Sequence, residues 1–174
     1  MVETNSDKKG SGGLFLVGFM GCGKTTVGRI LADRLSRPFL DLDQVIVDVV
    51  GKEIPNIFQE EGEPAFRRYE RDLVKTLPIN AVIALGGGAF IQDEIRAYTR
   101  HAGKAIFLDW PFQVLFSRVA GDESRPLAKN ASAMRSLFEK RKPVYQKAGI
   151  VWSSVAPHDE TPEEIADQLL NLLA

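Results

Sequence analysis

The residues best suited to chemistry lie in a glycine-rich segment near the start of the chain, where positions 18–25 read Gly-Phe-Met-Gly-Cys-Gly-Lys-Thr. Glycines let backbone N–H groups turn inward and form a nest for an anion. Lys24 adds a charge that can reach the β- and γ-phosphates of a nucleotide, and the hydroxyl of Thr25 can bind Mg²⁺. The spacing G-x-x-x-x-G-K-[ST] therefore predicts a phosphate-binding loop.

The flanking sequence supplies the strand and the helix that such a loop requires. Residues 14–17 form a short apolar run typical of a buried strand. After the loop, apolar side chains recur at helical spacing at Val27, Ile30, Leu31 and Leu35. A helix in this position aims the positive end of its dipole at bound phosphates. The order strand, loop, helix argues against the alternative, a chance glycine-rich loop.

Two aspartates close the second apolar run, at 38–42. Asp41 and Asp43 are two residues apart, so strand alternation predicts that both lie on one side of the strand. Phosphoryl transfer needs a carboxylate that positions a metal and a group that receives the proton of the acceptor hydroxyl. Asp41 is the candidate for holding Mg²⁺ through water, and Asp43 for the proton. Alternatively one of them, Asp43 above all, is only the N-cap of the next helix.

Three consecutive glycines, Gly86–Gly88, follow the third apolar run, at 81–85. Ordering three glycines is entropically costly, so we expect them where the backbone approaches a ligand closely. A tight turn is the alternative. Ligands in open parallel sheets collect at the carboxyl ends of the strands, which favours the functional interpretation.

Several arginines could bind an anionic substrate. Arg67 and Glu70 are spaced i, i+3, so the glutamate can orient the guanidinium to grip a carboxylate through two hydrogen bonds. By itself such a pair is more often an ordinary surface ion pair. Arg118 ends a predicted helix, Arg125 lies in a polar segment that is a candidate lid, and Arg141 comes later. A lid arginine can stabilise charge on a transferring phosphoryl group.

Composition limits the classes of protein that are possible. The 174 residues suit one domain, and 22 basic and 23 acidic side chains nearly cancel, which argues against a nucleic-acid partner. The lone cysteine, Cys22, excludes an internal disulfide, and we expect it to be a small filler of the phosphate loop. No apolar stretch approaches the length of a membrane span. We expect a cytoplasmic protein with a disordered tail at residues 1–13 and a single domain at 14–174.

Alternating apolar runs and helical segments predict an α/β fold with a parallel sheet covered on both faces. The expected strands are 14–18, 38–42, 81–85, 104–108 and 149–152. The expected helices are 24–36, 43–51, 62–77, 92–101, 111–120, 131–147 and 161–173. Two long connections remain, 51–62 and the candidate lid at 120–133.

Taken in order, these motifs resemble the shikimate kinase family over residues 14–147. The resemblance is carried by the phosphate loop and by Asp41-x-Asp43, Phe66-Arg67-x-x-Glu70, Gly86-Gly87-Gly88, Arg125-Pro126-Leu127 and Arg141-x-Pro143-x-Tyr145. It implies a P-loop NTPase fold of the nucleoside monophosphate kinase type, with a five-stranded parallel sheet in the order 2-3-1-4-5, flanking helices and a lid. It places the substrate-binding segment at about 43–77.

The resemblance also implies transfer of the ATP γ-phosphate to the 3-hydroxyl of shikimate, in aromatic amino-acid biosynthesis, by a monomer that uses Mg²⁺. It implies catalytic roles for Lys24, Asp43 and Arg125, and a metal site at Thr25 and Asp41. The implied ATP-binding residues are Gly21, Cys22, Gly23, Lys24, Thr25, Thr26, Arg118, Arg125 and Pro162. The implied shikimate-binding residues are Asp43, Phe58, Arg67, Glu70, Gly86, Gly87, Gly88 and Arg141.

Two other interpretations remain open from the residues alone. A different small-molecule kinase of the same fold, for example one acting on gluconate, would keep the phosphate loop but need not keep Asp43, Arg67 and Arg141 together. A non-catalytic nucleotide-binding switch would have no reason to carry a complete set of substrate-side residues.

Overall fold

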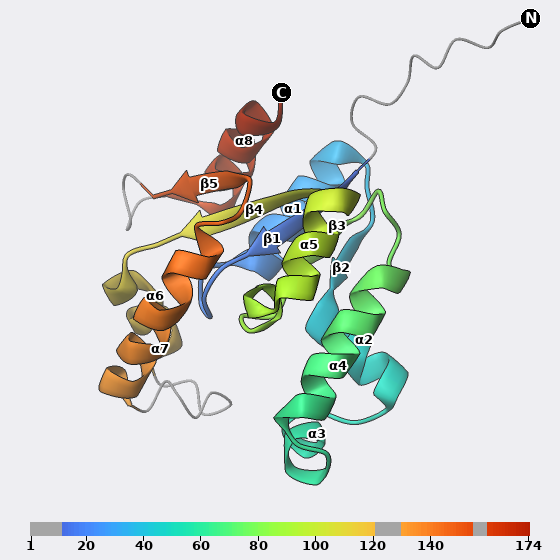
Figure 1. Ribbon diagram of the computed structural model, residues 1–174. Helices are drawn as coiled ribbons and strands as arrows, with labels where there is room; N and C mark the ends of the chain where they lie inside the picture. The colour runs from blue at the N-terminus through green and yellow to red at the C-terminus, as the bar shows by residue number, and fades with distance from the viewer. Residues whose placement is uncertain (1–11, 121–129, 155–159) are drawn as a thin grey trace, which may run out of the picture.

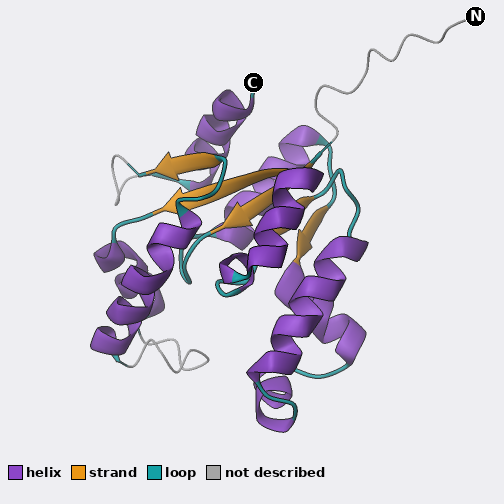
Figure 2. Ribbon diagram, in the orientation of Figure 1, coloured by secondary structure: helices purple, strands orange, loops and turns teal. Residues whose placement is uncertain are grey.

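The protein is built around a five-stranded parallel sheet whose strands lie in the order β2-β3-β1-β4-β5 (Figures 1 and 2). The structure, a computed structural model, describes residues 12–120, 130–154 and 160–174. The predicted strand order is confirmed. The strands are β1 Gly13–Val17, β2 Phe39–Asp41, β3 Val82–Ala84, β4 Gly103–Asp109 and β5 Ile150–Ser153.

The central strand β1 pairs with β3 on one side and β4 on the other, in the register Leu14 opposite Val82 and Lys104. All five of its residues are buried, as expected for a strand covered on both faces. The predicted tail reached residue 13, but Gly13 already belongs to β1. Of the rest of that predicted tail, residues 1–11 lie outside the described part of the chain.

Helices cover the sheet and extend beyond it. In Figure 1, α1 lies behind the sheet with α8 packed against it, and α5 lies in front. Two further groups, α2–α4 and α6–α7, project beyond the carboxyl ends of the strands (Figure 2). No described helix is long and apolar enough to cross a membrane. The helices are α1 Lys24–Leu35, α2 Leu42–Val50, α3 Ile54–Glu60, α4 Glu63–Leu73, α5 Asp93–Ala102, α6 Phe112–Val119, α7 Ala131–Tyr145 and α8 Pro162–Leu173, with 3₁₀ turns η1 Val74–Thr76 and η2 Ala89–Ile91.

The predicted connection at 51–62 is wrong, because it contains helix α3. Gly51 ends α2 in the left-handed region at φ 72°, and a proline in the first turn of α3 favours a new start. Only Ile57 of α3 is buried, so the segment lacks the periodic apolar signal that would have revealed it. The predicted helix 62–77 is also divided, since α4 ends at Leu73 and continues as η1.

The candidate lid at 120–133 falls largely on residues 121–129, which lie outside the described residues. Its last part is helical. The side chain of Asn130 caps α7 by accepting a hydrogen bond from Ala133 N at 3.0 Å. The end of the chain follows the expected pattern, with Thr161 and Glu164 forming a capping box at the start of α8.

Gly28 lies where α1 packs closely against the sheet. A Cβ there would lie 2.5 Å from Phe39 Cε2 and 2.9 Å from Leu16 Cδ1. Alanine favours a helix by about 1 kcal/mol, but overpacking typically costs ~1–3 kcal/mol. We therefore expect Gly28→Ala to lower the free energy of unfolding measured by urea denaturation.

Gly149→Ala is the matched control, because its Cβ would meet nothing within 4 Å. Its free energy of unfolding should stay within about 0.5 kcal/mol of wild type. Equal stability of the two variants would show that α1 shifts without cost and would contradict the packing argument.

Candidate active site

The phosphate loop joins β1 to α1 and turns on glycines. Gly18, Gly21 and Gly23 have φ values of 149°, 78° and 87°, which L-residues rarely adopt. Lys24 Nζ donates hydrogen bonds across the loop to the carbonyl oxygens of Gly18 at 3.0 Å and Phe19 at 3.2 Å. These bonds keep the lysine side chain folded over the loop. Its ammonium group is thereby held where the predicted phosphates bind.

Cys22 has the filler role predicted for it. Its side chain is buried beneath the loop at 1% exposure. Its carbonyl oxygen accepts a hydrogen bond from Trp110 Nε1 at 3.1 Å, which ties the loop to the end of β4. The Trp110 indole therefore holds the phosphate loop in place through this hydrogen bond.

The two predicted metal-site residues lie together. Thr25 Oγ1 donates a hydrogen bond to Asp41 Oδ2 at 2.8 Å. Hydroxyl and carboxylate oxygens suit Mg²⁺, which keeps several waters and takes phosphate oxygens as further ligands. No cluster of three or more His, Cys, Asp or Glu side chains that could hold a metal by itself occurs among the described residues. The donor set therefore fits a nucleotide-bound Mg²⁺ rather than a closed protein site.

The argument that placed Asp41 and Asp43 on one side of a strand is wrong. Strand β2 ends at Asp41, and Asp43 lies in the first turn of α2. The N-cap is Asp41 rather than Asp43, since Asp41 Oδ1 accepts a hydrogen bond from Asp43 N at 3.1 Å. The helical turn nevertheless brings both carboxylates to the same cavity.

Two adjoining cavities occupy the carboxyl edge of the sheet. The larger, about 1250 Å³, is lined by the phosphate loop, Asp41, Arg118 and Pro162. The smaller, about 170 Å³, lies between the α2–α4 group and α7. The two cavities share five of their lining residues, Met20, Asp43, Ile54, Gly86 and Gly87. Among the residues that the structure describes, Asp43 is the only acidic one that borders both cavities.

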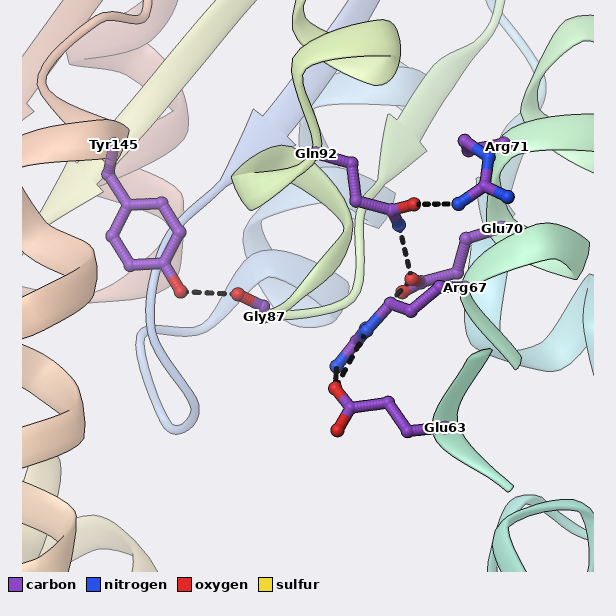
Figure 3. A network of polar contacts seen from close by, with 7 residues as sticks. All are labelled: Glu63, Arg67, Glu70, Arg71, Gly87, Gln92 and Tyr145. Atoms are coloured by element: carbon purple, nitrogen blue, oxygen red, sulfur yellow. Dashed lines mark hydrogen bonds and ion pairs between the residues drawn. The ribbon is translucent and has the colours of Figure 1, made fainter. Parts of the chain in front are cut away.

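Arg67 lies in the smaller cavity, held by two carboxylates of its own helix (Figure 3). Its Nη1 donates to Glu70 Oε2 at 2.7 Å, which confirms the predicted i, i+3 pair. On the other side, Nη2 and Nε donate to Glu63 Oε1 at 2.8 and 3.1 Å. All three nitrogens of the guanidinium are therefore hydrogen-bonded. The role of Glu63 was not predicted.

Glu70 is the most deeply buried charged side chain of the site, with 0% exposure. Burial raises its pKa from 4.5 to about 7, and nearby Arg67 acts in the opposite direction. Asp43 also raises the pKa, by repulsion between like charges, and Arg141 lowers it. Glu70 therefore titrates close to neutral pH.

The turn formed by Gly86–Gly88, called here the glycine turn, passes close to the side chains of Asp43, Glu70 and Arg67. A Cβ on Gly86 would lie 2.5 Å from Asp43 Oδ1 and 3.2 Å from Glu70 Oε1. A Cβ on Gly88 would collide with the Arg67 guanidinium. The glycines therefore lie close to charged protein side chains, and their predicted approach to a ligand stays a prediction.

Arg141 completes the smaller cavity from α7. Its Nη1 lies 3.5 Å from the position of a Cβ on Gly87. Tyr145, one turn further along α7, is fully buried and donates its hydroxyl to the carbonyl oxygen of Gly87 (Figure 3). Burial raises the pKa of that hydroxyl well above 10, so it remains a donor at neutral pH. Tyr145 thus anchors the glycine turn to α7.

Arg118 and Pro162, the residues predicted to lie at an adenine site, both line the larger cavity. The Arg118 guanidinium stacks on Trp110, with Cζ 3.8 Å from the ring centroid, and its Nη1 donates to Gly21 O at 3.3 Å. Glu160 also lines this cavity. Burial lowers the pKa of Arg118.

One predicted site residue is not brought into this arrangement. Phe58 lies on α3, 38% exposed, and lines neither cavity, although its ring packs 4.8 Å from that of Phe66, which does. Arg125 lies outside the described residues. Thr26 lines the larger cavity as expected.

Comparisons with known proteins agree with this geometry. A sequence model of the family described as shikimate kinase matches residues 20–174. Curated shikimate kinases of Persephonella marina and Nostoc punctiforme are each 39% identical to this chain, over 160 and 165 residues. The first match covers 90% of this chain and 96% of the relative, and the second covers 92% and 90%. The chain belongs to the shikimate kinase family.

Solved structures extend the match to three dimensions. A shikimate kinase from Acinetobacter baumannii, in complex with shikimate, superposes with a TM-score of 0.87 at 34% identity, covering 95% of this chain and 94% of that one. A gluconokinase from Sinorhizobium meliloti reaches a TM-score of 0.65 at 17% identity, covering 95% and 93%, and shares the fold. The predicted family and fold class are therefore confirmed.

Three supporting residues were missed from the sequence. Trp110 holds the phosphate loop and Arg118, and Gln92 and Arg71 extend the Glu70 network. The hydrogen bonds of Trp110, Gln92 and Arg71 join residues 21 to 88 positions apart, so no local spacing could have revealed them.

The pKa of Glu70 predicts a pH dependence of stability. A folded-state pKa near 7, above the ordinary 4.5, means that the native protein binds more protons than the unfolded chain between these values. The stability from this protonation is present below pH 4.5 and is lost as the pH rises to 7. Relative to Glu70→Gln, the wild-type free energy of unfolding should fall by up to ~3 kcal/mol across this window.

Urea denaturation at pH 4.5, 6 and 7.5 measures this difference. Glu139→Gln, which removes an exposed carboxylate from α7, is the matched control. Parallel pH curves for wild type and Glu70→Gln would contradict the assignment.

Proposed function

We propose that the protein transfers the γ-phosphoryl group of ATP to the 3-hydroxyl of shikimate, giving shikimate 3-phosphate and ADP in aromatic amino-acid biosynthesis. One observation carries the proposal: two cavities adjoin at Asp43, with the phosphate loop on one side and the guanidinium groups of Arg67 and Arg141 on the other. A small acid that bears hydroxyls needs cations for its carboxylate and a carboxylate for its hydroxyls. The arrangement supplies both, and positioning of this kind provides much of the catalysis.

On the nucleotide side, Lys24 exchanges its bonds to the carbonyls of Gly18 and Phe19 for phosphate oxygens. The N–H groups of the phosphate loop bind the same phosphates. Thr25 and Asp41 would hold Mg²⁺, Asp41 through water, and the ion would there supply positive charge that offsets the charge developing on the phosphates. Arg118 and Pro162 flank the adenine.

On the acid side, Arg67 and Arg141 grip the carboxylate, and Gly86–Gly88 meet the substrate through backbone N–H groups. The 3-hydroxyl then lies beside Asp43 and in line with the γ-phosphate. Its oxygen bonds to the γ-phosphorus while the bond from that phosphorus to the β–γ bridging oxygen breaks. ADP leaves with the electron pair, and Asp43 receives the hydroxyl proton.

Two residues complete the proposed site. Arg125 stabilises charge on the transferring group after closure over ATP, and Phe58 contributes through its packing on Phe66, which lines the smaller cavity. We also expect the protein to be a cytoplasmic monomer without nucleic-acid or membrane partners. These expectations rest on the sequence and the family.

A coupled assay of ADP release tests the substrate. With ATP and Mg²⁺, we expect turnover with shikimate and none with gluconate or without an acceptor. Asp43→Asn should reduce kcat by ~10²–10⁴ while nucleotide binding, measured by calorimetry, stays near wild type. Turnover with gluconate alone would indicate the other kinase of this fold, and acceptor-independent ADP release would indicate a nucleotide switch.

Arg67→Ala tests the carboxylate site. Removing a half-buried cation that pairs with the substrate should weaken shikimate binding by ~2–5 kcal/mol and leave the KM for ATP little changed. Arg68→Ala, which removes an exposed arginine next to it on α4, is the matched control. A loss confined to ATP affinity would show that Arg67 binds ATP rather than the shikimate carboxylate.

A further inference from the structure

Gln92 connects the glycine turn to the carboxylate that holds Arg67. It follows η2 and immediately precedes α5, so its backbone is fixed at both ends. Its Nε2 donates a hydrogen bond to Glu70 Oε2 at 2.7 Å. Its Oε1 accepts one from Arg71 Nη1 at 2.8 Å, and Arg71 Nε pairs with Glu94 Oε2 at 2.7 Å. Figure 3 shows the Gln92 amide between Glu70 and Arg71.

Only one orientation of this amide satisfies both neighbours. An arginine side chain has donors and no acceptor, so the carbonyl end of Gln92 must face Arg71. The NH₂ end is thereby turned toward Glu70. An N–H donor complements an ionised carboxylate, whereas a protonated carboxyl presenting its own hydrogen there finds no acceptor. Arg71 therefore determines which protonation state of Glu70 the amide favours.

Glu70 depends on this donor because its surroundings oppose ionisation. It is fully buried, and Asp43 of α2 faces it with a like charge. The favourable groups are Arg67 of its own helix, which also pairs with Glu63, and Arg141 of α7. Both hydrogen bonds found for the carboxylate, from Arg67 and Gln92, end on Oε2. The buried Oε1 has no hydrogen-bond partner among the described residues.

We propose that Gln92 is a positioning residue for substrate binding: its amide, fixed by Arg71, favours the ionised form of Glu70, and the carboxylate in turn holds the Arg67 guanidinium toward the acid substrate. The inference rests on the proposed function, since it assigns Arg67 to the substrate carboxylate. Gln92 touches no reacting atom. Its loss should therefore raise the KM for shikimate and leave kcat and the KM for ATP nearly unchanged.

The decisive variant is Gln92→Leu, which keeps the volume of the side chain and removes both polar ends. A hydrogen bond to a charged group is strong enough that its loss should raise the pKa of Glu70 by roughly one to two units. ¹³C NMR of labelled glutamate side chains, with Glu70→Gln for assignment, measures that pKa directly. The KM for shikimate at pH 7 should rise roughly tenfold, and the difference from wild type should shrink at pH 9, where Glu70 ionises again.

Arg71→Leu is the second variant, and it decides the matter if Gln92→Leu does not fold. The Arg71 side chain is 31% exposed, and its loss frees the amide to turn over. We expect a rise in the Glu70 pKa and in the KM for shikimate, smaller than for Gln92→Leu. Arg68→Leu removes the same charge from an exposed position of α4 and should leave both values as in wild type.

Two outcomes would overturn the proposal. One is a wild-type Glu70 pKa in the variants that fold. The other is a KM for shikimate raised equally at pH 7 and pH 9, which would indicate a structural role alone. Failure of the proposed function is distinguishable, because an enzyme that does not phosphorylate shikimate still permits the NMR titration of Glu70.

Discussion

The close packing of opposite charges around one backbone turn is the constraint on which the rest of the site depends. Side chains from α2, α4 and α7 converge on Gly86–Gly88, and any Cβ at Gly86 or Gly88 would displace a charged group. The turn itself is held from α7 by Tyr145 and leads directly into Gln92. Two carboxylates and two guanidinium groups offset one another there, which lets Glu70 be fully buried beside a cavity.

This arrangement separates two tasks. The phosphate loop and α1 are attached to the buried central strand β1, so the proposed nucleotide side is built on the centre of the sheet. The acid side is built from helices that project beyond the sheet (Figure 1). Asp43 lies where the two sides meet, in the first turn of α2, and its backbone N–H is fixed by Asp41. The smaller cavity therefore depends on the placement of these helices, whereas the phosphate loop depends on the sheet.

Much of the fold could be predicted because its signals are local. Continuous apolar runs marked all five strands, and glycine spacing marked the phosphate loop. Helix α3 was missed because it buries one side chain, and the placement of Asp43 failed because β2 ends earlier than its apolar run suggested. The i, i+3 pair of Arg67 and Glu70 was visible in the sequence. The bonds from Gln92 to Glu70 and from Trp110 to the phosphate loop span 22 and 88 positions, and only the folded chain reveals them.

The two tryptophans of the chain lie together at the nucleotide end, with ring centroids 5.2 Å apart. Trp110 contacts both the phosphate loop and the arginine stacked above it, while Trp152 bonds to Gln168 of α8. Neither ring lines the smaller cavity. The tryptophan emission of the protein consequently originates beside the proposed nucleotide site only. It can serve as a label-free optical probe of nucleotide binding that responds little to binding in the smaller cavity.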